Sequence, residues 1–255
     1  MRSFGSLLLR GLIVGLFAGL LAGTFAYVMG EPHIDAAIAI EEAGGAAHTH
    51  DSTGAATPAE PEEKPLVSRD GQRAGLFLAT SLYGLAVGGV FATAFAFLRR
   101  RIRTLSDSYA VLRMAAAGFV AVVVVPFLKY PPNPPAVGDP DTITKRTVTY
   151  LLTLVIGILA VWLAAWVAHR APARPDWLPL AAGAGAFVVT IVAAYLLLPT
   201  ISEVPGDFPA VLLWRFRFAS LGTQAVLWSL IGFGYAAALE LPHRVRATEP
   251  AAAAA

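Results

Sequence analysis

The sequence predicts an all-α integral membrane protein: a bundle of six transmembrane helices with acidic, proline-rich non-cytoplasmic loops. Hydrophobic residues make up 56% of the 255 residues and charged residues only 14%, whereas soluble domains average about 45–50% and about 25%. Six separate stretches each offer about 20 mostly apolar residues, the length that a helix needs to cross a bilayer. These observations exclude an intrinsically disordered chain and argue against an ordinary soluble enzyme. We expect a single polytopic membrane domain over residues 1–255.

The six spans differ in how clearly their ends are marked. The first is expected to be an uncleaved helix, because its apolar run is long for a signal peptide and no A-x-A site follows it. The third carries Arg113 near its start, where a long side chain can reach the interface. The sixth is placed after Arg215 and Arg217, since two arginines near the bilayer centre would be costly. The predicted spans are Leu7–Met29, Ala74–Leu98, Tyr109–Leu128, Val148–Val167, Leu178–Leu198 and Phe218–Leu239.

The charges of the connecting segments predict the orientation. With a cytoplasmic N-terminus, the inside segments total 46 residues and hold ten Lys or Arg and four Asp or Glu. The outside segments then total 82 residues, with eight Lys or Arg and thirteen Asp or Glu. The strongest marker is the arginine-rich run 99–103, which lies in a short connection where the positive-inside rule is most reliable. We therefore expect both termini to be cytoplasmic, including the tail 240–255.

The outside segments are the long ones, and loops often carry function. Residues 43–65 have low complexity and cannot bury apolar surface, so we expect them to be disordered or weakly ordered. Glu31–Glu42 alternates acidic and apolar residues and predicts a short amphipathic helix that caps the first span. We expect the chain to turn at Pro32, because proline cannot continue a helix internally.

Small and polar residues within the spans predict helix contacts. Glycines recur every four residues along one face of the first span, and two more lie in the second, so another backbone can approach closely. This strip could join the first two spans or bind a partner subunit. Gln224 lies two turns inside the sixth span and needs a partner, either an adjacent helix backbone, which is the commoner role, or a permeating ion. The glycines are Gly11, Gly15, Gly19 and Gly23, with Gly84 and Gly88.

Several function classes find no support in the sequence. The net charge is only +2, which gives no electrostatic case for nucleic-acid binding. The chain has no cysteine, so thiolate metal sites and a cysteine nucleophile are excluded. No span holds an acid of the kind that proton-coupled carriers need, and no P-loop is present. Because no catalytic motif is found, we expect a protein that is not an enzyme.

Three outer segments carry a resemblance to a known family. They are GEPHIDAAIAIEE (30–42), VPFLKYPPNPPAVGDPDTITKRT (125–147) and EVPGDFPAVLLWRFRFASLGTQAVLW (203–228). The chain resembles the CbtA family of cobalt transporter subunits of bacterial inner membranes. The resemblance implies cobalt as the transported ion rather than a cofactor, a link to cobalamin metabolism, and a small histidine-containing partner subunit, CbtB.

Two groups near the end of the first span have side chains that suit divalent metals. His48 and His50 lie within three residues in the low-complexity loop, and imidazole nitrogen is a ligand for Co²⁺, Ni²⁺ and Zn²⁺. Glu31, His33 and Asp35 gather where the chain leaves the membrane, and they could receive the ion. The alternatives are a polar linker for the histidines and interfacial capping of the short helix for Asp35.

The proline-rich segment Lys129–Arg146 offers two more candidate ligands. Its prolines enforce an extended path with few backbone donors. Asp139 and Asp141 are two residues apart, so on an extended chain they project to the same side and could bind a cation. The alternative is a stiff connector that holds the third and fourth spans together. We also expect Arg215 and Arg217 to pair with carboxylates of the outer loops.

The expected function is that of a membrane subunit in cobalt uptake. The competing interpretation is a non-transporting scaffold or regulatory subunit that packs against a partner membrane protein, which the lack of intramembrane acids would fit. A membrane enzyme on lipid-linked substrates would need a catalytic constellation that the sequence lacks. The expected partners are the lipid bilayer, the CbtB-like subunit and further copies of the chain, and no nucleic acid.

Overall fold

The structure, a computed structural model, describes residues 3–49, 67–102, 106–135, 137–138 and 140–247. Throughout this described part the regular elements are helical, and six helices are long and apolar enough to cross a membrane. The predicted six-helix fold is thereby confirmed. The elements are α1 (Phe4–Met29), α2 (Glu31–Thr49), α3 (Arg69–Leu98), α4 (Asp107–Phe119), the π-helix η1 (Val120–Val124), α5 (Val125–Lys129), the 3₁₀ helix η2 (Pro140–Thr142), α6 (Ile143–Arg170), α7 (Leu178–Leu197) and α8 (Ala210–Ala247).

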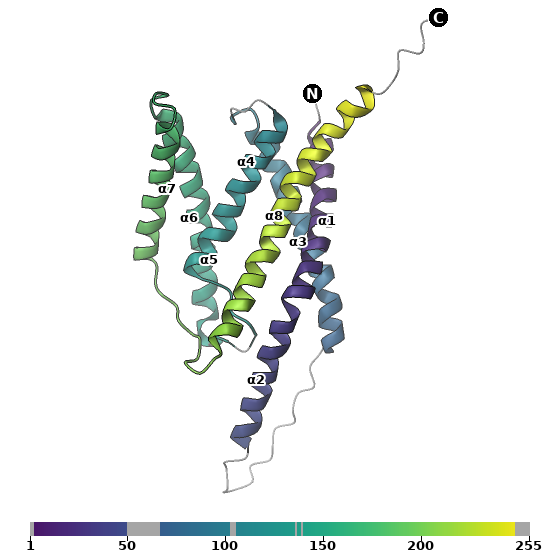
Figure 1. Cartoon of the computed structure of the whole chain (residues 1–255), viewed down its shortest axis with the longest axis vertical. Helices are drawn as coiled ribbons and strands as arrows, with labels where there is room; N and C mark the ends of the chain where they lie inside the picture. The colour runs from purple at the N-terminus through teal and green to yellow at the C-terminus, as the bar shows by residue number, and fades with distance from the viewer. Residues whose placement is uncertain (1–2, 50–66, 103–105, 136, 139, 248–255) are drawn as a thin grey trace, which may run out of the picture.

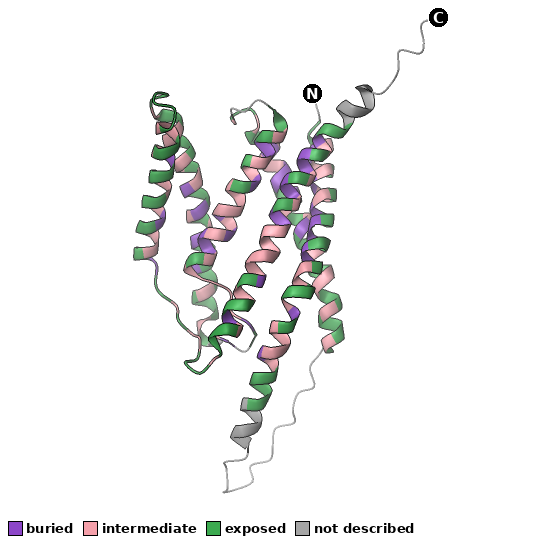
Figure 2. Cartoon of the chain, in the orientation of Figure 1, coloured by how far each residue is buried: buried purple, intermediate pink, exposed green. Residues whose placement is uncertain are grey.

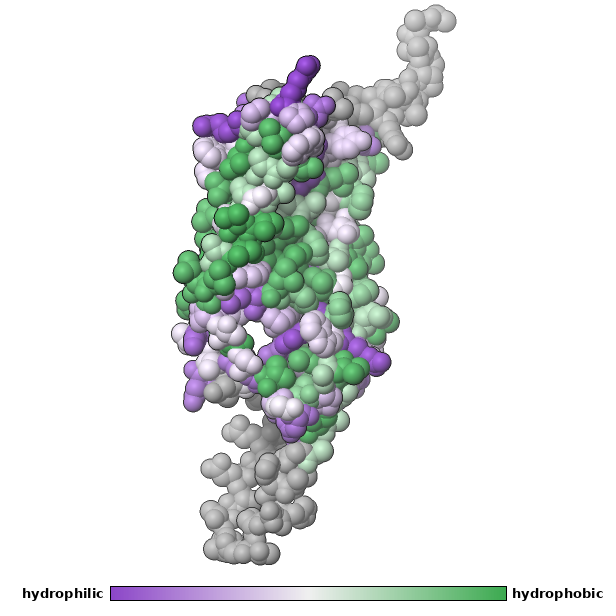
Figure 3. All heavy atoms as spheres, turned by 60° about the vertical axis from the view of Figure 1, so that its left-hand side comes forward, coloured by the Kyte–Doolittle hydropathy of each residue, from purple (hydrophilic) through white to green (hydrophobic). Residues whose placement is uncertain are grey.

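The helices form a bundle with an apolar middle and polar ends. On the face that Figure 3 shows, an apolar band lies between hydrophilic surfaces at the two ends of the molecule. The start of α1 and the end of α8 lie at the same end of the bundle (Figure 1). The long connections 130–142 and 198–209 lie at the other end, where α2 also projects. We call this the α2 end.

The first connection differs from the predicted turn. Gly30 stays in the right-handed helical region, and its N–H donates to the carbonyl of Ala26 at 2.7 Å. Pro32 therefore falls in the first turn of α2, where its missing N–H has no cost. In Figure 1, α2 extends along the line of α1 instead of folding back.

Helix α2 also runs further than expected. It ends at Thr49, so residues 43–49 of the segment predicted to be disordered or weakly ordered lie in this helix. Alanine is the strongest helix former, and three of these seven residues are alanine. Residues 50–66, which make up most of the segment predicted to be disordered, lie outside the described residues.

The start of the sixth span is also corrected. Helix α8 begins at Ala210, just after Pro209, whose carbonyl accepts from the N–H of Leu213 at 3.1 Å. Arg215 and Arg217 therefore lie inside the helix, not before it. The early start is tolerated because the Arg217 side chain reaches polar groups of the 130–142 connection: its Nη2 lies 2.9 Å from Asn133 Oδ1.

The bundle divides into two groups of helices. Helices α1, α3, α4 and α8 pack together around a core whose largest buried side chains include Tyr235 and Phe95, which meet edge to face at 5.6 Å. Helices α6 and α7 pack on each other and join the first group through η1 and α5. Helix α7 is largely exposed (Figure 2). We call the two groups the four-helix body and the α6–α7 hairpin.

The glycine strip joins the first two spans, which settles the alternative left open by the sequence. A Cβ atom added at Gly15 would lie 2.2 Å from the carbonyl oxygen of Gly84, and one at Gly88 would lie 2.2 Å from that of Gly11. Such distances show that α1 and α3 meet backbone to backbone. Small residues permit this approach in the bilayer, where dispersion contacts replace the hydrophobic effect.

Candidate functional site

The carboxylates at the start of α2 are held by arginines of α3. Arg69 Nη2 lies 2.5 Å from Glu31 Oε2 and 2.9 Å from Asp35 Oδ1. Arg73 Nη2 lies 2.9 Å from Asp35 Oδ2. The Arg69 guanidinium beside Asp35 holds the pKa of that carboxyl below its usual value, although partial desolvation opposes the shift. These four side chains form an ion-pair cluster that fixes α2 against α3.

This cluster changes the setting of the predicted entry site. Glu31 is buried, and both carboxylates face guanidinium groups, so a cation would have to displace arginine there. His33, between them in the sequence, is half-buried. Within the part of the chain that the structure describes, no three His, Asp or Glu side chains gather as a metal would require.

The other predicted ligands lie at or beyond the edge of the description. His48 falls in the last turn of α2, where the structure describes the helix but not the side chains. His50 and Asp139 lie outside the described residues. Asp141 is an exposed residue of η2, within the connection 130–142. These positions remain predictions.

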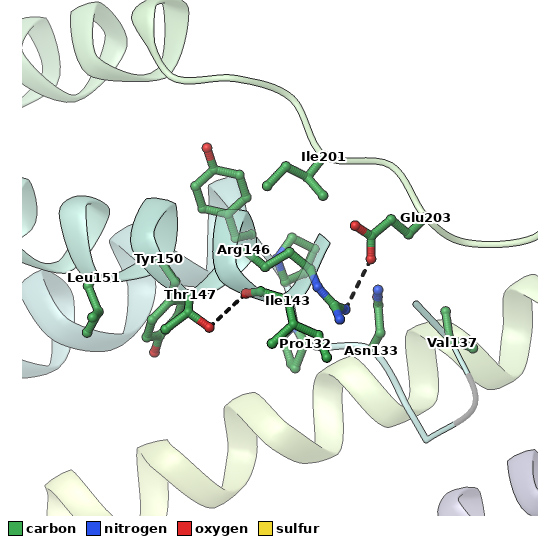
Figure 4. Close-up of a pocket in the computed structure, with 12 residues that line it drawn as sticks. Pro132, Asn133, Val137, Ile143, Arg146, Thr147, Tyr150, Leu151, Ile201 and Glu203 are labelled. Carbon is green, nitrogen blue, oxygen red and sulfur yellow. Dashed lines mark hydrogen bonds and ion pairs between the residues drawn. The ribbon is translucent and has the colours of Figure 1, made fainter. Parts of the chain in front are cut away.

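A cavity of about 400 Å³ opens between the connections at the α2 end. Figure 4 shows its polar side: Arg146 of α6 points to Glu203 in the connection after α7. Their Nη1 and Oε2 atoms lie 3.1 Å apart, and Thr142 also donates to Glu203. The lining residues are Tyr130, Pro131, Pro132, Asn133, Val137, Ile143, Arg146, Thr147, Tyr150, Leu151, Ile201 and Glu203. We call this the outer cavity.

The proline-rich connection is anchored on both sides of the outer cavity. Tyr130 donates its hydroxyl to the carbonyl of Pro199 at 2.7 Å, and burial raises the pKa of that phenol. On the other side, Arg217 of α8 donates to the carbonyl of Pro132 at 3.3 Å and to Asn133. The expected carboxylate pairing of the α8 arginines is therefore replaced, at Arg217, by a backbone carbonyl and an amide. The connection bridges the α6–α7 hairpin and the four-helix body.

A second cavity, of about 290 Å³, continues between these two parts into the bundle. Its lining comes from α3, η1, α5, α6 and α8, and it shares three residues with the outer cavity. We call it the inner cavity. Its lining residues are Tyr83, Val122, Val123, Phe127, Tyr130, Pro132, Tyr150, Ser220, Leu221 and Gln224.

Sequence patterns contain little indication of these cavities. Tyr83 and Tyr150 line the inner one, yet in the sequence they stand out only as parts of apolar spans. The usable signal is a phenol hydroxyl within a predicted span, because such a group needs a polar partner. Gln224 is recognisable as a residue that needs a partner, and the structure places it in the cavity wall.

The comparisons with known proteins give a family and no individual relative. No curated protein matches the chain, and no solved structure does. A family described as "Probable cobalt transporter subunit (CbtA)" matches residues 4–240, which include the first five spans in full and the sixth up to its last residue but one. The chain is a multi-pass membrane protein that belongs to the CbtA family of cobalt transporter subunits.

Proposed function

We propose that the chain is the membrane-embedded subunit of a cobalt uptake system linked to cobalamin metabolism. The observation that carries the proposal is the family match over 4–240, together with six helices that can span a membrane and a cavity between the connections at the α2 end. Cobalt is the cargo and not a resident cofactor. The protein lies in a bacterial inner membrane with both termini cytoplasmic, as the arginine-rich connection 99–103 favours.

In this proposal the α2 end faces outward and collects the metal. His48 and His50 capture the ion. A second binding site, formed by Glu31, His33 and Asp35 at the end of the first span, then receives it. Because Arg69 and Arg73 hold both carboxylates, the ion exchanges places with guanidinium groups there. Asp139 and Asp141 flank the outer cavity in sequence and would supply oxygen ligands at its rim.

A partner subunit completes the system. The sequence contains no P-loop, so ATP hydrolysis would have to come from elsewhere. The proposed partner is a small histidine-containing CbtB-like membrane protein. A second proposed partner is another copy of the chain itself. Helix α7 contacts α6 and leaves most of its surface uncovered, so it offers room for lipid or for a partner helix.

The alternative is a non-transporting scaffold or regulatory subunit. The arginine-neutralised carboxylates of α2 favour it, because they are already committed to holding two helices together. Measurement of labelled cobalt uptake by cells with and without the gene separates the two. Transport predicts gene-dependent, saturable uptake that unlabelled cobalt inhibits better than nickel or zinc does. If the chain is a scaffold, cells that carry only the partner should take up cobalt as fast as cells that carry both proteins.

Capture by the loop histidines makes a separate prediction. Replacing His48 and His50 together by alanine should raise the cobalt concentration for half-maximal uptake and leave the maximal rate nearly intact. The reason is that a short tether keeps the captured ion near the entrance. Its effective concentration there is of about millimolar order. Replacing Ser52 and Thr53 by alanine is the matched control in the same segment. Normal uptake by the double histidine variant at limiting cobalt would make the loop a linker.

A further inference from the structure

Gln224 is a half-buried residue of α8 whose side-chain oxygen is buried and left unsatisfied by the packing. Its amide oxygen is shielded from solvent and has no hydrogen-bond partner among the described residues. Its neighbour Thr223 differs, because that hydroxyl donates to the carbonyl of Ala219 one turn back. A buried acceptor without a partner is destabilising and rare in native structures, so it needs an explanation. Contact with another helix, the commoner role for such a residue, does not supply one at this oxygen.

Gln224 is one of the residues that line the inner cavity. Tyr83 from α3, Tyr150 from α6 and Ser220 from α8 line the same space. The Tyr83 hydroxyl lies within reach of the Gln224 amide group, although the amide oxygen keeps no partner. The side chains therefore come from both sides of the gap between the four-helix body and the α6–α7 hairpin. A cavity with several polar groups and room for solvent is one that water can occupy.

The inner and outer cavities are neighbours and have three lining residues in common. Tyr130, Pro132 and Tyr150 line both. The outer cavity reaches the connections at the α2 end, whereas the inner one reaches Gln224, two turns into the sixth predicted span. Together their linings extend from the connections at one end of the protein to a polar residue within the membrane-spanning region.

We infer that the two cavities form the entry half of the cobalt pathway and that the Gln224 amide oxygen contacts the ion within the membrane. The inference rests on the proposed function and names the route for its cargo. The lining of the inner cavity offers amide and hydroxyl oxygens and no carboxylate or imidazole. Neutral oxygens bind a divalent cation weakly, which suits passage rather than storage.

The size of the inner cavity indicates the form of the ion. Six water molecules at about 30 Å³ each occupy roughly 180 Å³, which fits within about 290 Å³. Cobalt therefore keeps most of its hydration shell here, and the amide oxygen of Gln224 accepts from a bound water or replaces one. This arrangement lowers the cost of holding a charge among neutral groups.

Substitution of Gln224 tests the inference in cells that lack the chromosomal gene and carry the full chain. Gln224→Leu should lower the maximal rate of cobalt uptake about tenfold, the effect of losing one interaction of hydrogen-bond strength. Gln224→Glu keeps an oxygen ligand and should retain several times more uptake than Gln224→Leu. Thr223→Val, at the same depth but outside both cavities, should transport normally. Membrane levels of each variant are compared by quantitative immunoblot.

Cysteine labelling tests the route without transport, because the chain has no cysteine of its own. Ser220→Cys should react with a small water-soluble methanethiosulfonate reagent added at the α2 end, whereas Thr223→Cys should not. An unreactive Ser220→Cys variant overturns the water-filled route. If the wild-type chain takes up cobalt and the Gln224→Leu variant takes it up at the same rate, only the role of Gln224 is overturned. Absence of gene-dependent uptake by the wild-type chain would instead overturn the proposed function.

Discussion

At the scale of single residues, the contact between α1 and α3 leaves no room for a methyl group. Gly15→Ala would place its Cβ 2.2 Å from a backbone carbonyl, which cannot rotate away as a flexible side chain could. Overpacking of this kind costs about 1–3 kcal/mol. The purified variant should therefore melt at a lower temperature in detergent. Gly185→Ala is the control, because a Cβ there meets nothing within 4 Å and alanine favours the helix; equal melting temperatures for the two variants would refute the close contact.

A second residue-scale prediction concerns the ion-pair cluster. Glu31→Gln removes the buried charge that Arg69 approaches at 2.5 Å, and it should destabilise the protein by about 1–3 kcal/mol. The exposed Asp70 lies 3.6 Å from Arg73, so Asp70→Asn should stay within about 0.5 kcal/mol of the wild type. Denaturant or thermal unfolding in detergent gives both values. A Glu31→Gln variant as stable as Asp70→Asn would mean that the cluster does not fix α2.

The composition of this cluster is only half visible in the sequence. Glu31 and Asp35 are identifiable as functional candidates because acidic groups stand out at the end of an apolar run. Arg69 and Arg73 fall in the loop before the second predicted span, since their charges argue against a membrane helix. The pairing joins residues 34 to 38 positions apart. No local pattern specifies such a contact.

At the scale of elements, the attachment of α2 to α3 should depend on pH only in acid. The pKa of Asp35 is below its ordinary value of 3.8, chiefly because Arg69 donates hydrogen bonds to the carboxylate. A lowered folded-state pKa contributes stability that is complete above the unfolded value and is lost as pH falls through the folded value. The stability difference between the wild type and Asp35→Asn should thus be constant above about pH 5 and shrink below pH 3.8. A difference that already changes between about pH 7 and pH 5 would contradict this origin.

The spans are predictable because an apolar run of about 20 residues has few alternatives to a membrane helix. The ends of the spans are less predictable. Helix α3, for example, begins at Arg69 because the Ser68 side chain caps it by accepting a hydrogen bond from the N–H of Gly71 at 3.2 Å. The π-helix η1 has no signal in its own valine-rich residues. Pro126, which lacks an N–H, is the available hint, because a proline inside an apolar run disturbs the regular helix before it.

At the scale of the whole molecule, the bundle has two chemically different ends, and labelling can assign them. A cysteine at Ser52 should react with an impermeant reagent from outside the cell, and one at Thr104 should react only after the membrane is opened. The expectation follows from the positive-inside rule applied to the run 99–103. The reverse pattern would invert the orientation and place the outer cavity in the cytoplasm.

The arrangement of the helices could not be predicted from the sequence. The glycine strip pointed to a close helix contact, and the structure confirms that α1 pairs with α3. The division into a four-helix body and an α6–α7 hairpin depends on long-range packing that hydropathy does not encode, because every lipid-facing surface is equally apolar. The cavities follow from this division, so the sequence does not predict them either.

The ion pair between Arg146 and Glu203 constrains the order of events during synthesis. Arg146 lies in the first turn of α6 and Glu203 follows α7, so the partner is made only after the ribosome has completed both helices. Until then Lys145 and Arg146 stand as basic residues at the start of an apolar helix, a signal that, in the proposed orientation, favours the wrong side of the membrane. Correct insertion of α6 therefore depends on the topology already set by the earlier helices. Once Glu203 has been made, it neutralises Arg146 and joins the two ends of the finished hairpin.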